Sequence, residues 1–156
     1  MIRPIVTNIN ELRKPCELIK KEDNIKEIIQ DLKDTLEVKK CIGLTANQIG
    51  INKKISYIKI PKFIDKDKKI QYNEYIIINA KIIEKDRPVR INNESCVSFP
   101  GINVITRRYV YITLEYLDEN LLPQASAFQD LESLVIQHEV AHQESKTIFC
   151  FKWKAK

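Results

Sequence analysis

The sequence predicts an α+β fold in which mainly antiparallel sheets pack around a C-terminal helix, with a further helix near the N-terminus. Two observations carry this prediction. Isoleucine and leucine recur at steps of three and four over residues 25–36, and apolar residues do so again near the C-terminus, as on the buried side of a helix. Between these stretches lie three segments rich in β-branched and aromatic residues, which are typical of strands.

The N-terminal helix is expected to begin at Asp23 or Asn24, either of which can cap it, and to run to about Lys40. Lysines in its last turn suit the negative end of the helix dipole. The preceding residues, 1–22, contain two prolines and many charges, so an irregular arm is expected there.

Strands are expected at 54–60, 74–83 and 108–117, and a charged loop at 62–70. Pro88 should interrupt the chain after the second strand, because proline cannot donate to a sheet ladder. Pro100-Gly101 marks a turn.

The last helix is expected over about 127–144, since Ser126 and Gln129 have the spacing of a capping box. One stripe of this helix combines apolar side chains with the only two histidines of the chain: Leu131, Leu134, Val135, His138 and His142. We expect Leu131 to be an ordinary core residue that faces the sheet.

The 156 residues are expected to form a single domain, 1–156. A hydrophobic fraction of 44% and a charged fraction of 30% exclude a generally disordered chain. No apolar run approaches the roughly 18 residues of a membrane span, and the first residues lack the features of a signal peptide. We therefore expect a cytoplasmic protein with no membrane partner.

The net charge of +5, from 26 Lys and Arg against 21 Asp and Glu, is spread along the chain. We interpret it as ordinary solubility, with an anionic partner such as RNA as the alternative, and expect no specific DNA binding. The four cysteines contain no CxxC pair, which argues against a disulfide framework. The three glycines build no phosphate-binding loop, which disfavours a nucleotide-binding enzyme.

Both histidines lie in one HExxH motif, His138-Glu139-Val140-Ala141-His142. Residues four apart share a side of a helix, so two imidazoles can reach one metal ion. Glu139 can then act as a general base on a water at that metal. The alternative is a core helix whose two histidines happen to be four residues apart.

A third ligand is expected from upstream, because the chain has no third histidine and the only carboxylate after the motif, Glu144, falls on the wrong side of the helix. Cys96, in the segment ESCVS at 94–98, is the best candidate. A buried structural cysteine is the alternative and, for an isolated cysteine, the commoner outcome.

Three blocks together resemble the signatures of peptide deformylases. The segment CIGLTANQ at 41–48 is similar to GxGLAAxQ, ESCVS at 94–98 to EGCLS, and QHEVAH at 137–142 to QHExDH. The blocks occur in the family's order, and the resemblance covers most of the chain. Because the chain ends soon after the third block, a short form without the family's longer C-terminal helix is expected.

The resemblance implies that Cys96, His138 and His142 hold one divalent metal ion, usually Fe(II), for which Zn(II), Ni(II) or Co(II) can substitute. It implies that Glu139 moves the proton from water to the leaving amine. The implied partners are N-formylmethionyl peptides, which yield formate and a free N-terminal methionine, and the ribosome near its exit tunnel.

The resemblance also implies substrate contacts. The side chain of Gln48 and the backbone N–H of Val97 would donate to the developing oxyanion. The segment Ile42, Gly43 and Leu44 would pair with the peptide like an added strand. From their place one turn before the first histidine, we expect Leu134 and Val135 to line the pocket for the methionine side chain, with Ser95 adding a polar group nearby.

The chain departs from the family pattern at Cys41, Thr45, Ser95, Ala141 and Gln143, where the family has Gly, Ala, Gly, Asp and Leu. Ser95 is expected to narrow the pocket or demand a local backbone change, and Ala141 to lose a stabilising contact. The three implied metal ligands, and the side chains of Glu139 and Gln48, are the same as in the family pattern.

Two other functions stay open at this point. An unrelated HExxH metallopeptidase would need a third ligand outside residues 94–98. A catalytically impaired, deformylase-like peptide-binding protein would be indicated by loss of Glu139 or Gln48, and both are present.

Overall fold

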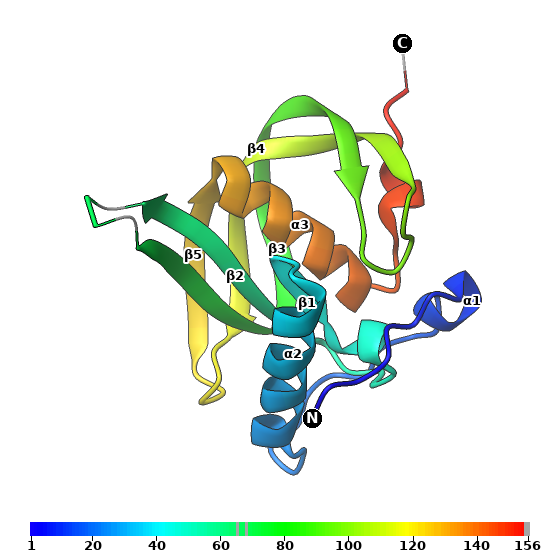
Figure 1. The fold of residues 1–156 in the computed structure, drawn as a ribbon, viewed down its shortest axis with the longest axis vertical. Coiled ribbons are helices and arrows are strands. Elements are labelled where there is room, and N and C mark those ends of the chain that lie inside the picture. The colour runs from blue at the N-terminus through cyan, green and yellow to red at the C-terminus, as the bar shows by residue number, and fades with distance from the viewer. Residues whose placement is uncertain (65, 68, 155–156) are drawn as a thin grey trace.

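The computed structural model describes residues 1–64, 66–67 and 69–154. Within these ranges one antiparallel sheet has the order β1 (Gly43–Thr45), β2 (Ile55–Ile64), β3 (Ile70–Ser95), β4 (Asn103–Leu117) and β5 (Pro123–Gln129). The helices are α1 (Ile9–Leu12), α2 (Ile25–Lys39) and α3 (Asp130–Gln143), with 3-10 turns at Ala46–Ile49 and Ile148–Phe151. The predicted α+β class, with antiparallel strands between an N-terminal and a C-terminal helix, is confirmed. In Figure 1 the strands curve around α3, and α2 lies next to β1.

The alternation of side chains along β2 lets one sheet serve two cores. Tyr57 packs with the apolar residues around α2, whereas its neighbour Ile58 packs with those around α3. Successive side chains of a strand point to opposite faces, so the two cores lie on opposite sides of β2. The helices contribute Ile28, Ile29, Leu32 and Leu36 from α2, and Val135, Ile136 and Val140 from α3. This packing fixes the orientation of α3 and hence of its histidines.

The prediction that Pro88 interrupts the chain is wrong. Pro88 lies inside β3 and pairs with Tyr109 of β4. Beyond Ile78, β3 pairs with β4 but no longer with β2, so this half of the strand has an open edge. A proline fits there because its missing N–H can face the open side.

The predicted start of the last helix is also wrong. Ser126 lies in β5, opposite Leu114 of β4, and α3 begins only at Asp130. Gln129 precedes the helix but makes no side-chain capping bond. The capping-box spacing was outweighed by pairing with β4, a long-range interaction that the local sequence does not show.

The loop predicted at 62–70 is shorter, because β2 continues to Ile64 and β3 begins at Ile70, opposite it. Residues 65 and 68 of that loop lie outside the described part of the chain. The turn at Pro100-Gly101 is confirmed, with Gly101 at a φ of 77° that favours glycine.

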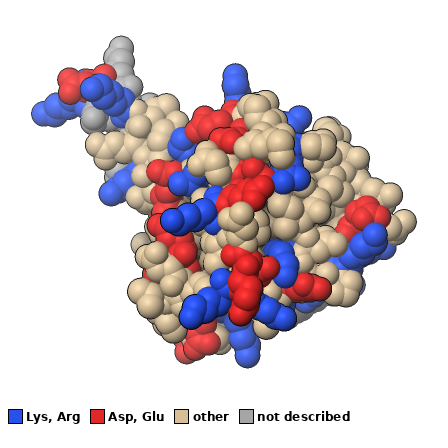
Figure 2. All heavy atoms as spheres, turned by 90° about the horizontal axis from the view of Figure 1, so that it is seen from below, with Lys and Arg blue, Asp and Glu red and all other residues tan. Residues whose placement is uncertain are grey.

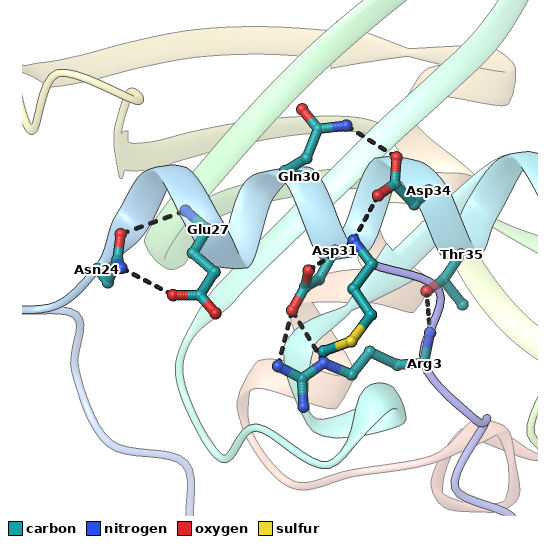
Figure 3. A network of polar contacts seen from close by, with 8 residues as sticks. Arg3, Asn24, Glu27, Gln30, Asp31, Asp34 and Thr35 are labelled. Carbon is teal, nitrogen blue, oxygen red and sulfur yellow. Dashed lines mark hydrogen bonds and ion pairs between the residues drawn. The ribbon is translucent and has the colours of Figure 1, made fainter.

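The N-terminal arm is more ordered than the sequence predicts. The guanidinium group of Arg3 lies 2.8 Å from Oδ2 of Asp31 on α2, and the Arg3 backbone N–H donates to Thr35 Oγ1 at 2.9 Å (Figure 3). On the same helix, Asn24 accepts from the backbone N–H of Glu27, which confirms it as the cap. The arm is thus fixed by contacts between residues about 30 positions apart, which no local pattern predicts.

Lys and Arg side chains are intermixed with Asp and Glu on the face shown in Figure 2. This mixture fits the interpretation of the small positive net charge as ordinary solubility. Among the described residues, no helix has the length and apolar character needed to cross a membrane.

Candidate metal centre and active site

Three potential metal ligands converge at α3. His138 and His142 lie one turn apart on this helix, and Cys96 directly follows β3. Their ligand atoms all lie within 4.8 Å of one another, and Cys96 Sγ is 3.4 Å from Nε2 of His142. A thiol with two imidazoles suits a transition-metal ion, whereas magnesium and calcium prefer oxygen ligands. The residues present therefore fit the metal that the sequence predicts.

Glu94, near the end of β3, orients the first of these histidines. Its Oε2 lies 2.9 Å from Nδ1 of His138, while Nε of Arg108 and Oγ1 of Thr106 donate to its Oε1 at 2.7 and 2.8 Å. Burial alone would raise the pKa of Glu94, but the hydrogen bonds from Arg108 and His138 outweigh it and hold this pKa well below its usual range. Glu94 therefore stays ionised. Because it binds Nδ1 of His138, the other ring nitrogen, Nε2, is free to bind a metal ion.

The two imidazoles differ in protonation. Burial alone would lower the pKa of His138, yet its hydrogen bonds with Cys96 and Glu94 outweigh this and raise the pKa to about 10. Burial, together with the charges of His138 and Arg108, lowers the pKa of His142 well below 6.5, so this ring is in the neutral form that binds metals. Metal binding at Nε2 of His138 would displace the proton there.

Glu139 lies against β1 and is 4% exposed. Thr45 Oγ1 donates to Glu139 Oε1 at 2.9 Å. The other carboxylate oxygen lies over Gly43, where a Cβ atom would come within 2.7 Å of it. Burial raises the pKa of Glu139, and the charge of His138 and the hydrogen bond from Thr45 oppose this shift only in part. A buried carboxylate with a raised pKa, next to a metal ligand, is suited to accept and return a proton.

Gln48, in the 3-10 turn after β1, has its amide orientation fixed. The backbone N–H of Thr45 donates to Gln48 Oε1 at 3.0 Å, so the amide nitrogen must point the other way. That nitrogen lies 3.1 Å from Ser98 Oγ and 3.5 Å from Cys96 Sγ. The backbone N–H of Val97 has no hydrogen-bond partner within the described ranges. The Gln48 amide therefore donates to both of these groups, and among the described residues the Val97 N–H is the unpaired donor next to Cys96.

A cavity of about 590 Å³ opens beside these groups. Of the residues predicted to contact substrate, it is lined by Ile42, Gly43, Gln48, Ser95, Val97, Leu134 and Val135, and also by Glu139.

Leu44, for which the resemblance implies pairing with the peptide backbone, has its side chain fully buried in the core around α2, because this side chain points to the face of β1 opposite that of Gly43. One prediction about the pocket needs correction. Leu131, predicted as a core residue, is 49% exposed and lines the cavity. The late start of α3 places Leu131 in the first turn of the helix, away from the sheet.

A family model for polypeptide deformylases matches residues 2–150 of the chain. The chain belongs to the peptide deformylase family. The matched range includes all three sequence blocks that predict the site. The three predicted metal ligands, Cys96, His138 and His142, lie close together in the structure.

Individual members of the family are similar along most of their length. The peptide deformylase of Clostridium beijerinckii is 35% identical over 146 residues, which cover 92% of this chain and 97% of the relative. That of Karelsulcia muelleri is 38% identical over 148 residues, or 94% and 76% of the two chains. Among solved structures, the peptide deformylase from Ehrlichia chaffeensis has a TM-score of 0.85 at 28% identity, with 99% of this chain and 89% of that chain covered. The one from Thermotoga maritima has a TM-score of 0.83 at 25% identity, with 99% of each covered.

One departure from the deformylase pattern has a simple outcome. Ser95 belongs to β3, pairs with Asn103, and does not have a positive φ, so serine replaces glycine without a special backbone conformation.

Sequence reasoning assigned no role to Glu94 or Arg108, although the sequence contains a signal for the second. The alternation of β4 places Arg108 on the buried side, in phase with Thr106 and Ile112. A buried charge needs a partner of opposite sign, so a carboxylate was to be expected nearby. Which carboxylate it is depends on the pairing of β3 with β4.

Proposed function

We propose that this family member removes the formyl group from the N-formylmethionyl end of nascent polypeptides, with release of formate and a free N-terminal methionine. The observation that carries the proposal is that Glu139 and His138 line the same cavity as Gly43 of β1, the strand at the edge of the sheet. A peptide end bound there meets a proton acceptor and the Cys96–His138–His142 group together.

The proposed ligands of one divalent metal ion are Cys96, His138 and His142. Fe(II) is the proposed ion in the cell, with Zn(II), Ni(II) or Co(II) as substitutes, in line with the thiol and imidazole donors. When bound, the ion supplies a Lewis acid that polarises the formyl carbonyl and makes water easier to deprotonate.

The peptide is proposed to add a strand to the open edge of β1. This strand pairs on one side with β2, and Lys59 N–H donates to Ile42 O at 2.9 Å. Neighbouring residues of a strand direct their backbone groups to opposite edges, so those of Gly43 face away from β2. Gly43 can therefore pair with the peptide backbone beside the reacting bond.

Proton transfer is assigned to Glu139, which takes a proton from the attacking water and delivers it to the leaving amine nitrogen. Its raised pKa favours acceptance of the proton, and its position in the cavity allows both transfers. The Nε2 amide of Gln48 and the backbone N–H of Val97 are assigned to the developing oxyanion. The contact of Gln48 with Cys96, and the place of Gln48 and Val97 in the lining of the same cavity, support this assignment.

Leu134 and Val135 are proposed to form the wall against which the methionine side chain packs, joined by the more exposed Leu131, which lines the same cavity. An unbranched thioether adapts well to such an apolar wall. Ser95 lines the same cavity and adds a polar group to it.

We further propose that residues 1–156 act as one catalytic domain in the cytoplasm. We also propose that this domain binds nascent chains at the ribosome, near the exit tunnel. The family match over 2–150 and the cores shared by sheet and helices support a single functional unit.

The direct test is formate release from formyl-Met-Ala-Ser by anaerobically purified, Fe(II)-loaded protein. We expect one formate and one new amino terminus per peptide cleaved. Internal cleavage of casein without formate would indicate an unrelated metallopeptidase, and peptide binding without turnover would indicate an impaired relative; either result would overturn the proposal.

The ligand set has its own test in Cys96→Ala. Loss of the thiolate leaves two protein ligands, so stoichiometric metal and formate release should both disappear. Metal analysis of the purified variant measures the first and the peptide assay the second. One ion per chain with full activity would show that Cys96 is not a ligand.

A further inference from the structure

A chain of buried hydrogen bonds runs from the end of α3 to the carboxylate of Glu139. Gln143 Nε2 donates to Ser56 Oγ at 2.9 Å, and Ser56 Oγ lies 2.7 Å from Thr45 Oγ1. Thr45 Oγ1 lies 2.9 Å from Oε1 of Glu139. The three residues before the glutamate are fully buried, so water does not compete for these bonds.

The direction of donation along this chain is set by its first member. The amide nitrogen of Gln143 can only donate, so Ser56 Oγ accepts there. The Ser56 proton is then available for Thr45, whose own proton faces two acceptors on Glu139, Oε1 of the carboxylate at 2.9 Å and the backbone O at 3.1 Å. With Glu139 ionised, as it must be to accept a proton, the reverse order would place two acceptor oxygens against each other at Thr45 and Glu139, which is unfavourable in a buried site.

Gln143 is itself firmly held. Its Oε1 accepts from the backbone N–H of Ala80 at 3.1 Å, and its Nε2 also donates to Ile77 O at 3.0 Å. These contacts to β3 fix which end of the amide faces Ser56, and thereby fix the polarity of the whole chain.

β1 holds the carboxylate of Glu139 from two positions on one face. Gly43 and Thr45 are two residues apart, so their Cβ directions coincide. Gly43 leaves the space that Oε2 occupies, and Thr45 supplies the donor to Oε1. Thr45 and Gln143 stand where the family pattern has Ala and Leu, so two departures from that pattern meet through Ser56 in one network.

We propose that Thr45 is a positioning residue for Glu139, and that Gln143, acting through Ser56, keeps the Thr45 hydroxyl directed at the carboxylate. This inference rests on the proposed function, because it takes Glu139 as the group that transfers the proton. Thr45 does not line the cavity, so loss of its hydroxyl should leave peptide binding unchanged. It should lower the fraction of molecules whose carboxylate is oriented for proton transfer, and hence kcat.

The experiment compares formate release by the wild type, Thr45→Val, Thr45→Ser and Thr35→Val, each loaded with the same metal. For Thr45→Val we expect kcat to fall about tenfold, as for other residues that orient a catalytic group, with KM and metal content unchanged. Thr45→Ser keeps the hydroxyl and should restore most of the lost kcat. Thr35 is another fully buried, hydrogen-bonded threonine, but it contacts the N-terminal arm, so Thr35→Val should keep the wild-type kcat.

A second comparison separates positioning from a general effect on folding. With Glu139→Gln already present, Thr45→Val should cause no further loss, because the group that it positions is gone. Gln143→Leu should lower kcat by less than Thr45→Val, since the Thr45 hydroxyl remains.

The experiment distinguishes failure of this inference from failure of the proposed function. No formate from the wild type would refute the deformylase assignment itself. Formate release by the wild type and by Thr45→Val at equal kcat would overturn the positioning role alone. An equal loss in the presence and absence of Glu139 would overturn it as well.

Discussion

Two glutamates on opposite sides of His138 have opposite electrostatic environments. Glu94 lies on the β3–β4 side, where Arg108 and His138 hold its pKa well below the usual range. Glu139 lies on the β1 side, where burial raises its pKa and its donor is the neutral hydroxyl of Thr45. Both carboxylates are largely buried, so the difference comes from their neighbours and not from their depth.

This contrast assigns the two groups to different tasks. A carboxylate paired with a guanidinium stays ionised, and therefore serves to orient a ligand histidine and keep its charge balanced. A buried carboxylate whose hydrogen-bond donor is neutral, and whose rise in pKa the charge of His138 offsets only in part, can exchange a proton. Substitutions at Glu139 and Glu94 should therefore have separable effects, on proton transfer and on metal affinity respectively.

The largest effect is expected for Glu139→Gln. The amide keeps the shape of the side chain but cannot accept the proton, so kcat should fall by about 10²–10⁴-fold. One metal ion per chain should remain, because Glu139 is not among the three grouped ligands. Formate release and metal analysis on the same sample measure both. A variant that keeps more than half of the wild-type rate would remove Glu139 from the mechanism.

Glu94→Gln should have the opposite effect to Glu139→Gln: it should lower metal affinity more than the kcat of the metal-loaded protein. Loss of the charge leaves Arg108 buried without its ion-pair partner, and we expect about 3 kcal/mol of lost stability. Outer contacts of a ligand histidine are typically worth about 10–100-fold in metal affinity. Denaturant unfolding and metal titration measure the two. Equal metal affinity in the variant and the wild type would contradict the orienting role of Glu94.

The same pair predicts a pH dependence of stability. The pKa of Glu94 is lower in the folded chain than its ordinary value of 4.5, so its stabilising contribution is present above that value and lost as the pH falls below it. The difference in unfolding free energy between the wild type and Glu94→Gln should therefore shrink between pH 5.5 and 3. In metal-free protein His138 stays protonated across this window, because its pKa is about 10. A difference that does not change with pH would contradict the shift assigned to Glu94.

A smaller effect is expected where β1 contacts Glu139. Gly43→Ala would place a Cβ atom 2.7 Å from Oε2, so the carboxylate must move, and we expect a loss in kcat of about tenfold. Gly50→Ala is the matched control. Its Cβ would meet open space at a φ of 85°, so it should cost about 1 kcal/mol of stability and leave kcat unchanged. Equal kcat losses in the two variants would show that Gly43 acts only through stability.

The contrast between the two glutamates was only half accessible from the sequence. The HExxH spacing fixes the geometry of His138, Glu139 and His142, because a helix brings residues four apart to one side. Cys96 was identified through its motif, and the structure places it with the histidines. The environment of Glu94 was not predicted, since Arg108 reaches it through the register of β3 and β4.

The errors in the fold have the same origin. Local signals predicted a helix cap at Ser126 and a break at Pro88, and strand pairing overrode both. Helix α2 was predicted closely because its period and its Asn24 cap are local. Thr45 was recognised as a departure from the family pattern, but its contact with Glu139 spans 94 positions and is visible only in the fold.

The smallest effect is expected at Leu131, an exposed residue that lines the cavity. Leu131→Ala should barely change stability, because the side chain is 49% exposed. It should lower kcat/KM for formyl-Met peptides by only about 2–10-fold, since apolar pockets discriminate weakly between similar side chains. Formyl peptides that differ only in the first residue provide the measurement.

For the wild type we expect formyl-Met to be cleaved faster than formyl-Gly and formyl-Asp, with a preference over formyl-Leu of about tenfold at most. If formyl-Met has no advantage over formyl-Asp, Leu134 and Val135 do not form the side-chain pocket. If Leu131→Ala instead lowers kcat for every peptide equally, the apolar rim acts on Glu139 itself, and the two sides of α3 are less independent than their opposite pKa shifts indicate.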